Sequence, residues 1–152
     1  MLRELRARSA PERRALVEAV LSLAVATIAV RVFPFRRTAR LVGLTEDATV
    51  PRATARQLAR AERIGWAVRT VADRLPWTST CVVRALATVA LLRLRGIPAQ
   101  MHLGVDTDVV HKGGFAAHSW ISCDGRVLVG DQSHLDRYAV IGTYTVQSVR
   151  WK

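Results

Sequence analysis

The pattern of hydrophobic and polar positions divides the chain into a helical first part and a strand-rich second part. Residues 11–33 include an uninterrupted run of 12 apolar or small residues between Glu18 and Arg31. A helix that spans a membrane needs about 20 such residues. The run therefore predicts a helix that is buried or faces a partner, with peripheral contact to a membrane as the alternative.

Two further helices are predicted between residues 52 and 95. Pro34 ends the apolar helix, Gly43 closes a short basic turn, and residues 44–51 have the composition of a linker. A helix over residues 52–76 then carries apolar or small residues near helical spacing, with arginines on the other side: Leu58, Ala61, Gly65, Val68, Val71 and Leu75. The next helix covers about 80–95, where Thr80 is an eligible N-cap and Gly96 and Pro98 end the segment.

After Pro98 the period changes to that of strands. Residues 99–105, 115–122 and 126–131 fit strands, residues 106–114 form a loop, and the last apolar stretch adds one or two strands. Asp124-Gly125 is a strong signal for a two-residue hairpin turn. Helices followed by an antiparallel sheet indicate an α+β fold. We divide the chain into an N-terminal helical segment over 1–47, for docking or core packing, and a core over 48–152.

Composition is consistent with one soluble domain. Half of the 152 residues are hydrophobic, which is enough for a real core. The two cysteines stand 42 positions apart, at 81 and 123, and imply no disulfide scaffold. No small-residue cleavage site follows the apolar run, so we expect no secretory signal and a cytoplasmic location.

The net charge of +11 comes mainly from arginine, since only Lys112 and Lys152 are lysines. Guanidinium groups make forked hydrogen bonds to carboxylates and phosphates, so an acidic peptide or protein surface is the expected partner. Aromatic residues are sparse and are not interleaved with the basic ones. We therefore do not expect nucleic-acid binding.

Cys81 stands in the first turn of the helix predicted over 80–95. The helix dipole there favours the thiolate, and free backbone N–H groups at the same place can stabilise an oxyanion. Cysteine is also a common small hydrophobe of protein cores. Position alone leaves these two interpretations equal.

The hairpin adds a second piece of chemistry. A turn at 124–125 pairs Ile121 with Leu128 and, further along the same ladder, His118 with Asp131. The helix-start cysteine, with an imidazole oriented by a carboxylate, matches the arrangement of nucleophile, base and orienting group. A one-residue bulge would break this register.

Other constellations fit less well. The chain contains no Asn, which excludes a Cys-His-Asn triad. The cysteines and histidines lack the CxxC or HxxxH spacing of zinc ligands, so we predict no metal site and no cofactor. We expect Cys123 and His102 to be structural, and we see no partner for His111 and His134 in their loops.

At this point the residues match a family. "TSTCVVRALATVALLRLRGIPAQMHLGV", followed by "FAAHSWISCDGRVLVGD", resembles the transglutaminase-like fold of papain-type cysteine enzymes. More narrowly, these segments and "FPFRRTARLVG" resemble the lasso-peptide biosynthesis B proteins in their stand-alone leader-peptidase form. The resemblance covers about residues 15–135 and implies Cys81 as nucleophile, His118 as base and Asp131 as orienting residue.

The resemblance also implies a function and partners. These proteins cut the leader from a precursor peptide, which a small leader-recognition protein delivers, and a lasso cyclase then closes the ring. We expect arginines to face the complex of leader and recognition protein, with six candidates: Arg36, Arg37, Arg40, Arg56, Arg60 and Arg63. Two alternatives stay open. One is another acyl transfer on the same triad, such as transglutamination or amide formation. The other is a non-catalytic scaffold.

Overall fold

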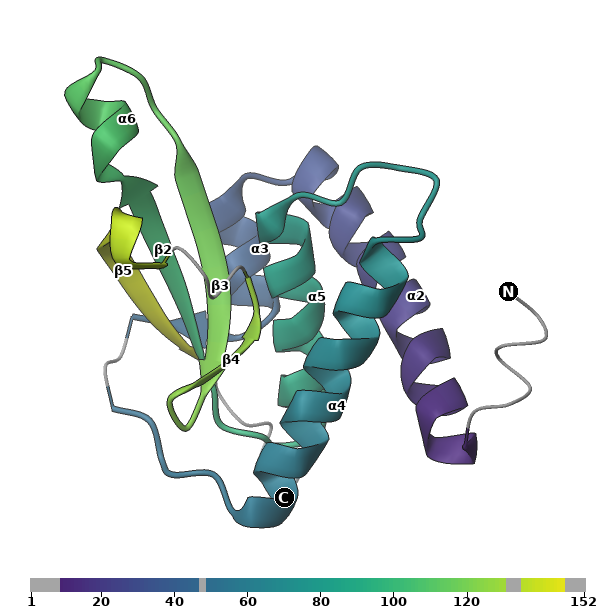
Figure 1. The fold of residues 1–152 in the computed structure, drawn as a ribbon. Helices are drawn as coiled ribbons and strands as arrows, with labels where there is room; N and C mark the ends of the chain where they lie inside the picture. Colours follow the sequence, from purple (N-terminus) through teal and green to yellow (C-terminus); the bar gives the residue numbers. More distant parts are fainter. Residues whose placement is uncertain (1–8, 47–48, 131–134, 147–152) are drawn as a thin grey trace.

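The computed structural model describes residues 9–46, 49–130 and 135–146 and has the predicted α+β architecture. Four of its helices precede most of its strands along the chain, and the short helix α6 lies between two strands (Figure 1). The elements in order are α2 (Ala10–Val32), α3 (Phe35–Leu41), β1 (Leu44–Thr45), α4 (Ala55–Ala72), α5 (Cys81–Leu94), β2 (Gln100–Asp106), α6 (Thr107–His111), β3 (Ala117–Cys123), β4 (Arg126–Val129), the short 3₁₀ helix η1 (Leu135–Arg137) and β5 (Tyr138–Val146).

The strands form one antiparallel sheet in the order β1-β5-β2-β3-β4. Helices α4 and α5 pack against one face of this sheet, and α2 packs on the outside of both helices (Figure 1). The core between these layers is aliphatic, with Leu86, Leu92, Met101 and Ile121 almost fully buried. The layering leaves the outer side of α2 facing away from the core.

Helix α5 begins where the sequence predicts, after the cap at Thr80, whereas α4 begins at Ala55, three residues later than predicted. At the start of α4 the Thr54 side chain accepts a hydrogen bond from the Gln57 backbone N–H, and the Gln57 side-chain oxygen accepts one from the Thr54 backbone N–H. The Thr80 side chain accepts from the Val83 backbone N–H in the same way at the start of α5. Each cap satisfies a donor that the helix itself leaves free.

Three short elements correct the sequence prediction. The basic segment after Pro34 is the helix α3 and not a turn, and residues 107–111 are the helix α6 and not a loop. The Asp106 carboxylate, which accepts from the backbone N–H groups of Asp108 and Val109, explains why α6 starts there. Leu44–Thr45 is not linker but the edge strand β1, which pairs with the end of β5.

The N-terminal helix agrees with the predicted segment 11–33 and extends well beyond its uninterrupted run of 12 apolar or small residues. Helix α2 has 23 residues, and its most apolar 18-residue stretch reaches a mean hydropathy of 2.0. By length and composition alone this one described helix could cross a membrane, although a core helix passes the same test. Its inner residues Leu16, Ala19, Leu23 and Ala26 belong to the common hydrophobic core.

Candidate active site

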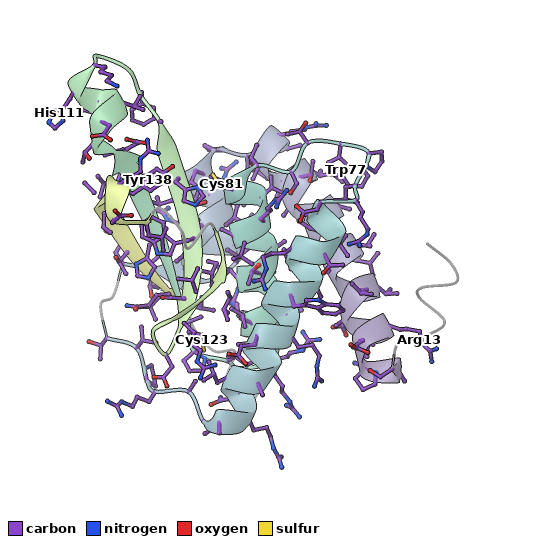
Figure 2. The ribbon with its side chains drawn as sticks, in the orientation of Figure 1. Arg13, Trp77, Cys81, His111, Cys123 and Tyr138 are labelled. Carbon is purple, nitrogen blue, oxygen red and sulfur yellow. The ribbon has the colours of Figure 1, made fainter. Side chains whose placement is uncertain are left out.

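Cys81 is the first residue of α5, as the sequence predicts. Thr80, the residue before Cys81, is the N-cap of this helix. The backbone N–H of Cys81 therefore belongs to the first turn, whose donors have no partner within the helix. Cys81 is partly exposed and lies at the upper end of α5 (Figure 2). Both features suit a nucleophile that a substrate must reach.

A cleft of about 630 Å³ brings Cys81 together with His118 of β3. The cleft lies where the start of α5 meets β3 and β4, and it includes residues of α4 and α5 as well as of the hairpin. Besides Cys81 and His118 it is lined by Arg69, Ser79, Arg84, Ser119, Val127, Val129 and Gly130. The predicted nucleophile and base, 37 positions apart in the sequence, therefore share one cavity.

The register that predicts a His118–Asp131 pair is wrong beyond Ser122. Ser122 pairs with Val127 as expected, but a bulge follows, and Ile121 pairs with Val129 instead of Leu128. The extra residue turns the Leu128 carbonyl toward α4, where it accepts a hydrogen bond from the Arg69 guanidinium. Asp131 itself lies outside the described residues, so its role as orienting residue stays a prediction.

Aromatic rings surround the His118 imidazole on the sheet. The ring of Tyr138 lies 5.0 Å from it and that of Trp120 lies 6.1 Å away, between ring centroids. Gly104, which pairs with His118 across β2 and β3, leaves room for this arrangement. A Cβ atom at Gly104 would lie 2.9 Å from Tyr138 and 3.0 Å from the Trp120 ring, so a larger residue would displace the rings that hold the imidazole.

The sequence analysis does not identify four polar residues that line the cleft, which are Arg69, Ser79, Arg84 and Ser119. Arg84 stands one turn after Cys81, where it bonds the Asp73 carboxylate at 2.8 Å and the Ser79 carbonyl at 3.2 Å. Helical spacing from Cys81 could have identified Arg84, whereas nothing in the sequence connects Arg69 with the hairpin. The Ser79 and Ser119 hydroxyl oxygens are buried, and neither has a hydrogen-bond partner among the residues that the structure describes.

This geometry agrees with a family assignment. Residues 23–143 match the profile of the family described as the transglutaminase-like superfamily, which covers most of the chain. The chain belongs to this superfamily. Curated proteins and solved structures gave no significant match. Transglutaminase-like proteins are typically cysteine-based enzymes with protease or acyltransferase activity, and the cleft in this member contains a cysteine, Cys81, and a histidine, His118.

The second cysteine of this transglutaminase-like domain is buried away from the cleft. Cys123 lies near the lower end of the sheet (Figure 2), and its thiol donates a hydrogen bond to the Pro98 carbonyl at 3.2 Å. Burial raises the pKa of the Cys123 thiol, and the nearby carboxylates of Asp124 and Glu62 raise it further. A protonated, buried thiol is a structural group, in agreement with the sequence interpretation.

His102 is likewise held within the sheet. Its two ring nitrogens share hydrogen bonds with Ser122 at 2.8 Å and with Thr143 at 3.3 Å, and its ring stacks on Trp120. Burial lowers the pKa of His102, which keeps the ring neutral. His111 ends α6, and His134 lies outside the described residues.

The six arginines proposed to face a partner lie on two helices, three on α3 and three on α4. Arg36, Arg37 and Arg40 lie on α3, at the end of α2. Arg56, Arg60 and Arg63 lie on α4. Arg60 and Arg63 line a second cavity of about 300 Å³, together with Arg14, Glu18 and Arg95.

Proposed function

We propose that this transglutaminase-like protein is a cysteine peptidase that removes the leader from a ribosomally synthesised lasso precursor peptide. The observation that carries the proposal is the common cleft of Cys81, at a helix start, and His118, on the adjoining strand. The sequence segments that contain these two residues resemble the lasso leader peptidases. The cysteine-based chemistry of the superfamily agrees with acyl transfer to water.

Cleavage begins when the His118 imidazole takes the Cys81 proton and the thiolate attacks the scissile carbonyl carbon. The negative charge that develops on the carbonyl oxygen is stabilised by the backbone N–H of Cys81, which has no acceptor within the helix. The C–N bond then breaks, and the His118 imidazolium gives its proton to the leaving amine. This step frees the amino terminus of the core peptide and leaves the leader as a thioester on Cys81.

Water completes the reaction. His118 takes a proton from water, the resulting hydroxide attacks the thioester carbonyl, and the C–S bond breaks to release the leader as a carboxylate. Asp131 orients the His118 ring through both steps and does not itself react. The freed amine is the group on which a separate lasso cyclase would close the ring.

A small leader-recognition protein delivers the precursor in this proposal. The cavity with Arg60 and Arg63 is the docking place that we favour for the acidic side of that complex. It holds four guanidinium groups and the single carboxylate of Glu18, so an anionic side chain would find an excess of donors there. Arg56 stands one turn before Arg60 on the same helix and extends the basic surface.

Mass spectrometry of the precursor peptide, incubated with this protein and its recognition partner, tests the proposal. We expect a free leader and a free core, with one water added across the bond. A cross-linked product without cleavage would instead select another acyl transfer, and an unchanged precursor under all conditions would contradict the proposal.

Variants separate catalysis from scaffolding. Cys81→Ala and His118→Ala should each lower kcat by roughly 10⁴-fold or more, and Asp131→Ala should do less damage because it orients and does not react. Cys123→Ser is the matched control and should keep near-normal cleavage. Full activity in Cys81→Ser, or unchanged maturation after Cys81→Ala, would contradict the proposed nucleophile.

A further inference from the structure

Helix α2 exposes a row of large aliphatic side chains along its outer side. Val17, Leu21, Val25, Ile28 and Val32 are each between 61% and 66% exposed. Their spacing of three or four residues places them on one side of the helix, in a row about 23 Å long. Val20 and Phe33 border this row, which we call the outer stripe, and are also exposed.

The fold itself does not use the outer stripe. The inner side of α2 supplies Leu16, Ala19, Leu23 and Ala26 to the core. Only 28% of the most apolar 18-residue stretch is buried, although its mean hydropathy is 2.0. Contiguous apolar surface of this kind on a folded domain marks an interaction site.

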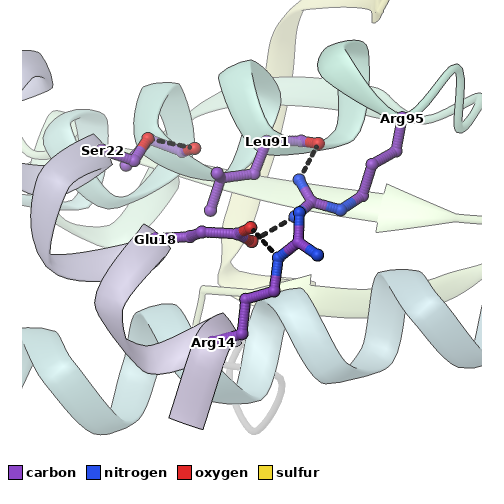
Figure 3. Close-up of polar contacts among 6 residues, drawn as sticks. Arg14, Glu18, Ser22, Leu91 and Arg95 are labelled. Atoms are coloured by element: carbon purple, nitrogen blue, oxygen red, sulfur yellow. Dashed lines mark hydrogen bonds and ion pairs between the residues drawn. The ribbon is translucent and has the colours of Figure 1, made fainter. Parts of the chain in front are cut away.

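Polar contacts hold α2 against α5, so that only the outer side of the helix is available. The Ser22 hydroxyl donates to the Ala87 carbonyl at 2.9 Å. Glu18 accepts from Arg14 at 2.9 Å and also bonds Arg95, which in turn donates to the Leu91 carbonyl at 3.1 Å (Figure 3). A spanning arrangement would expose these groups to hydrocarbon, whereas a helix that lies in a membrane interface keeps all of them.

Basic residues flank the outer stripe at both ends. Between positions 13 and 45 the sequence has six arginines and one acidic residue, Glu18. Glu18 is already paired with Arg14 and Arg95. The six are Arg13, Arg14, Arg31, Arg36, Arg37 and Arg40, and all are exposed. Arg14 continues the row of Val17 and Leu21, and the Arg37 guanidinium lies 5.8 Å from the centre of the Phe33 ring.

We propose that the outer stripe of α2, with its flanking arginines, docks this protein in the interface of an anionic lipid bilayer. The aliphatic side chains enter the boundary between headgroups and acyl chains, and the guanidinium groups bind lipid phosphates. A second copy of the chain suits the stripe less well, because an antiparallel pair would bring Arg13 and Arg14 against the arginine group at the other end. The proposal does not depend on the peptidase function.

Flotation of the full chain with lipid vesicles tests this docking. We expect binding to vesicles of phosphatidylcholine mixed with phosphatidylglycerol, and little binding to phosphatidylcholine alone. Arg36→Gln with Arg37→Gln should weaken binding about 25-fold, because each basic residue at an anionic surface contributes about a factor of five. Leu21→Glu with Ile28→Glu should weaken it at least tenfold, by loss of aliphatic insertion.

The matched control for the glutamates is Val140→Glu with Ile141→Glu, which changes two exposed aliphatic residues of β5. This control should bind vesicles nearly as well as the unchanged protein, and circular dichroism should show that every variant is folded. Equal loss in the control and stripe variants would overturn the proposal. So would binding to neither vesicle, or a dimer in solution that the stripe variants dissociate.

Discussion

At the scale of single residues, the two cysteines differ in the features that govern thiol reactivity. Cys81 is partly exposed in the cleft, whereas Cys123 is 1% exposed and donates to the Pro98 carbonyl. Burial also raises the pKa of Cys123, and a higher pKa means less thiolate at neutral pH. This difference in exposure predicts that a soluble alkylating reagent will modify Cys81 before Cys123.

Iodoacetamide at neutral pH should therefore modify Cys81 and spare Cys123 in the folded protein. Peptide mapping by mass spectrometry after a short exposure measures both sites, and loss of precursor cleavage should follow the modification of Cys81. Both cysteines should react once the protein is unfolded in denaturant. Faster labelling of Cys123 than of Cys81 in the native state would contradict the proposed site.

Ser119 offers a second test at this scale, because its hydroxyl is buried in the cleft without a partner among the described residues. Such a group costs about 1–3 kcal/mol, so Ser119→Ala should maintain or raise the free energy of unfolding. If the hydroxyl donates to bound substrate, kcat/KM should nevertheless fall. Urea unfolding and cleavage kinetics measure the two effects separately.

Ser122→Ala provides the matched control for Ser119. The Ser122 hydroxyl already shares a hydrogen bond with His102 at 2.8 Å, so its loss should cost about 1 kcal/mol of stability and leave cleavage nearly unchanged. A Ser119→Ala protein with normal kcat/KM would remove Ser119 from substrate binding.

At the scale of elements, local signals predicted the long helices and the hairpin turn because caps and turn residues act within a few positions. Thr80 and Asp124-Gly125 are such signals, and the structure has α5 and the β3–β4 turn where they indicate. Asp106 is an equally good local signal, since it caps the start of α6. Strand β1 has only two residues and exists through pairing with β5, which no local pattern reveals.

The bulge in the hairpin could not be predicted because its cause lies in another element. Gly65 of α4 approaches Leu128 so closely that a Cβ atom would lie 2.6 Å from the Leu128 carbonyl oxygen. Arg69, one turn later, donates to that same oxygen. Contacts 59 or more positions apart in the sequence therefore set the register that carries β4 to the cleft.

Gly65→Ala should disturb this arrangement. Alanine normally favours a helix over glycine by about 1 kcal/mol, but here the added methyl must displace β4. We expect a net loss of about 1–3 kcal/mol in the free energy of unfolding, as in other overpacked sites. Cleavage should also slow, because Val127, Val129 and Gly130 of the same hairpin line the cleft.

Ala59→Gly, at an exposed position of α4, is the control for Gly65→Ala. It should lose about 1 kcal/mol by helix propensity alone and keep normal cleavage. Chemical unfolding and kinetic measurements on both variants provide the comparison. A Gly65→Ala protein as stable as the unchanged protein would show that α4 and β4 have room to separate.

At the scale of the whole molecule, two groups of the arginines that give the chain its net charge of +11 lie in different surroundings. The arginines of α3 adjoin the aliphatic outer stripe, whereas Arg60 and Arg63 of α4 line a polar cavity with Glu18 and Arg95. Composition predicted an anionic partner but could not show this division, because the approach of α2 to α4 creates the cavity. The two groups can therefore be tested separately.

Leader delivery should depend on salt and on the cavity arginines. Cleavage at sub-saturating precursor should slow as salt rises through the physiological range, where the Debye length falls to about 8 Å and long-range attraction is screened. Arg60→Glu with Arg63→Glu should raise the apparent KM roughly tenfold or more, since charge reversal turns steering into repulsion. Turnover of a short leaderless test peptide should stay unchanged, because neither arginine lines the Cys81 cleft.

Arg52→Glu with Lys112→Glu makes the same change in net charge at exposed sites outside the cavity, and this control should alter KM far less. An equal rise in KM for both pairs would indicate a diffuse effect of net charge, and a rate indifferent to salt and to both pairs would leave the α4 arginines as solvated surface.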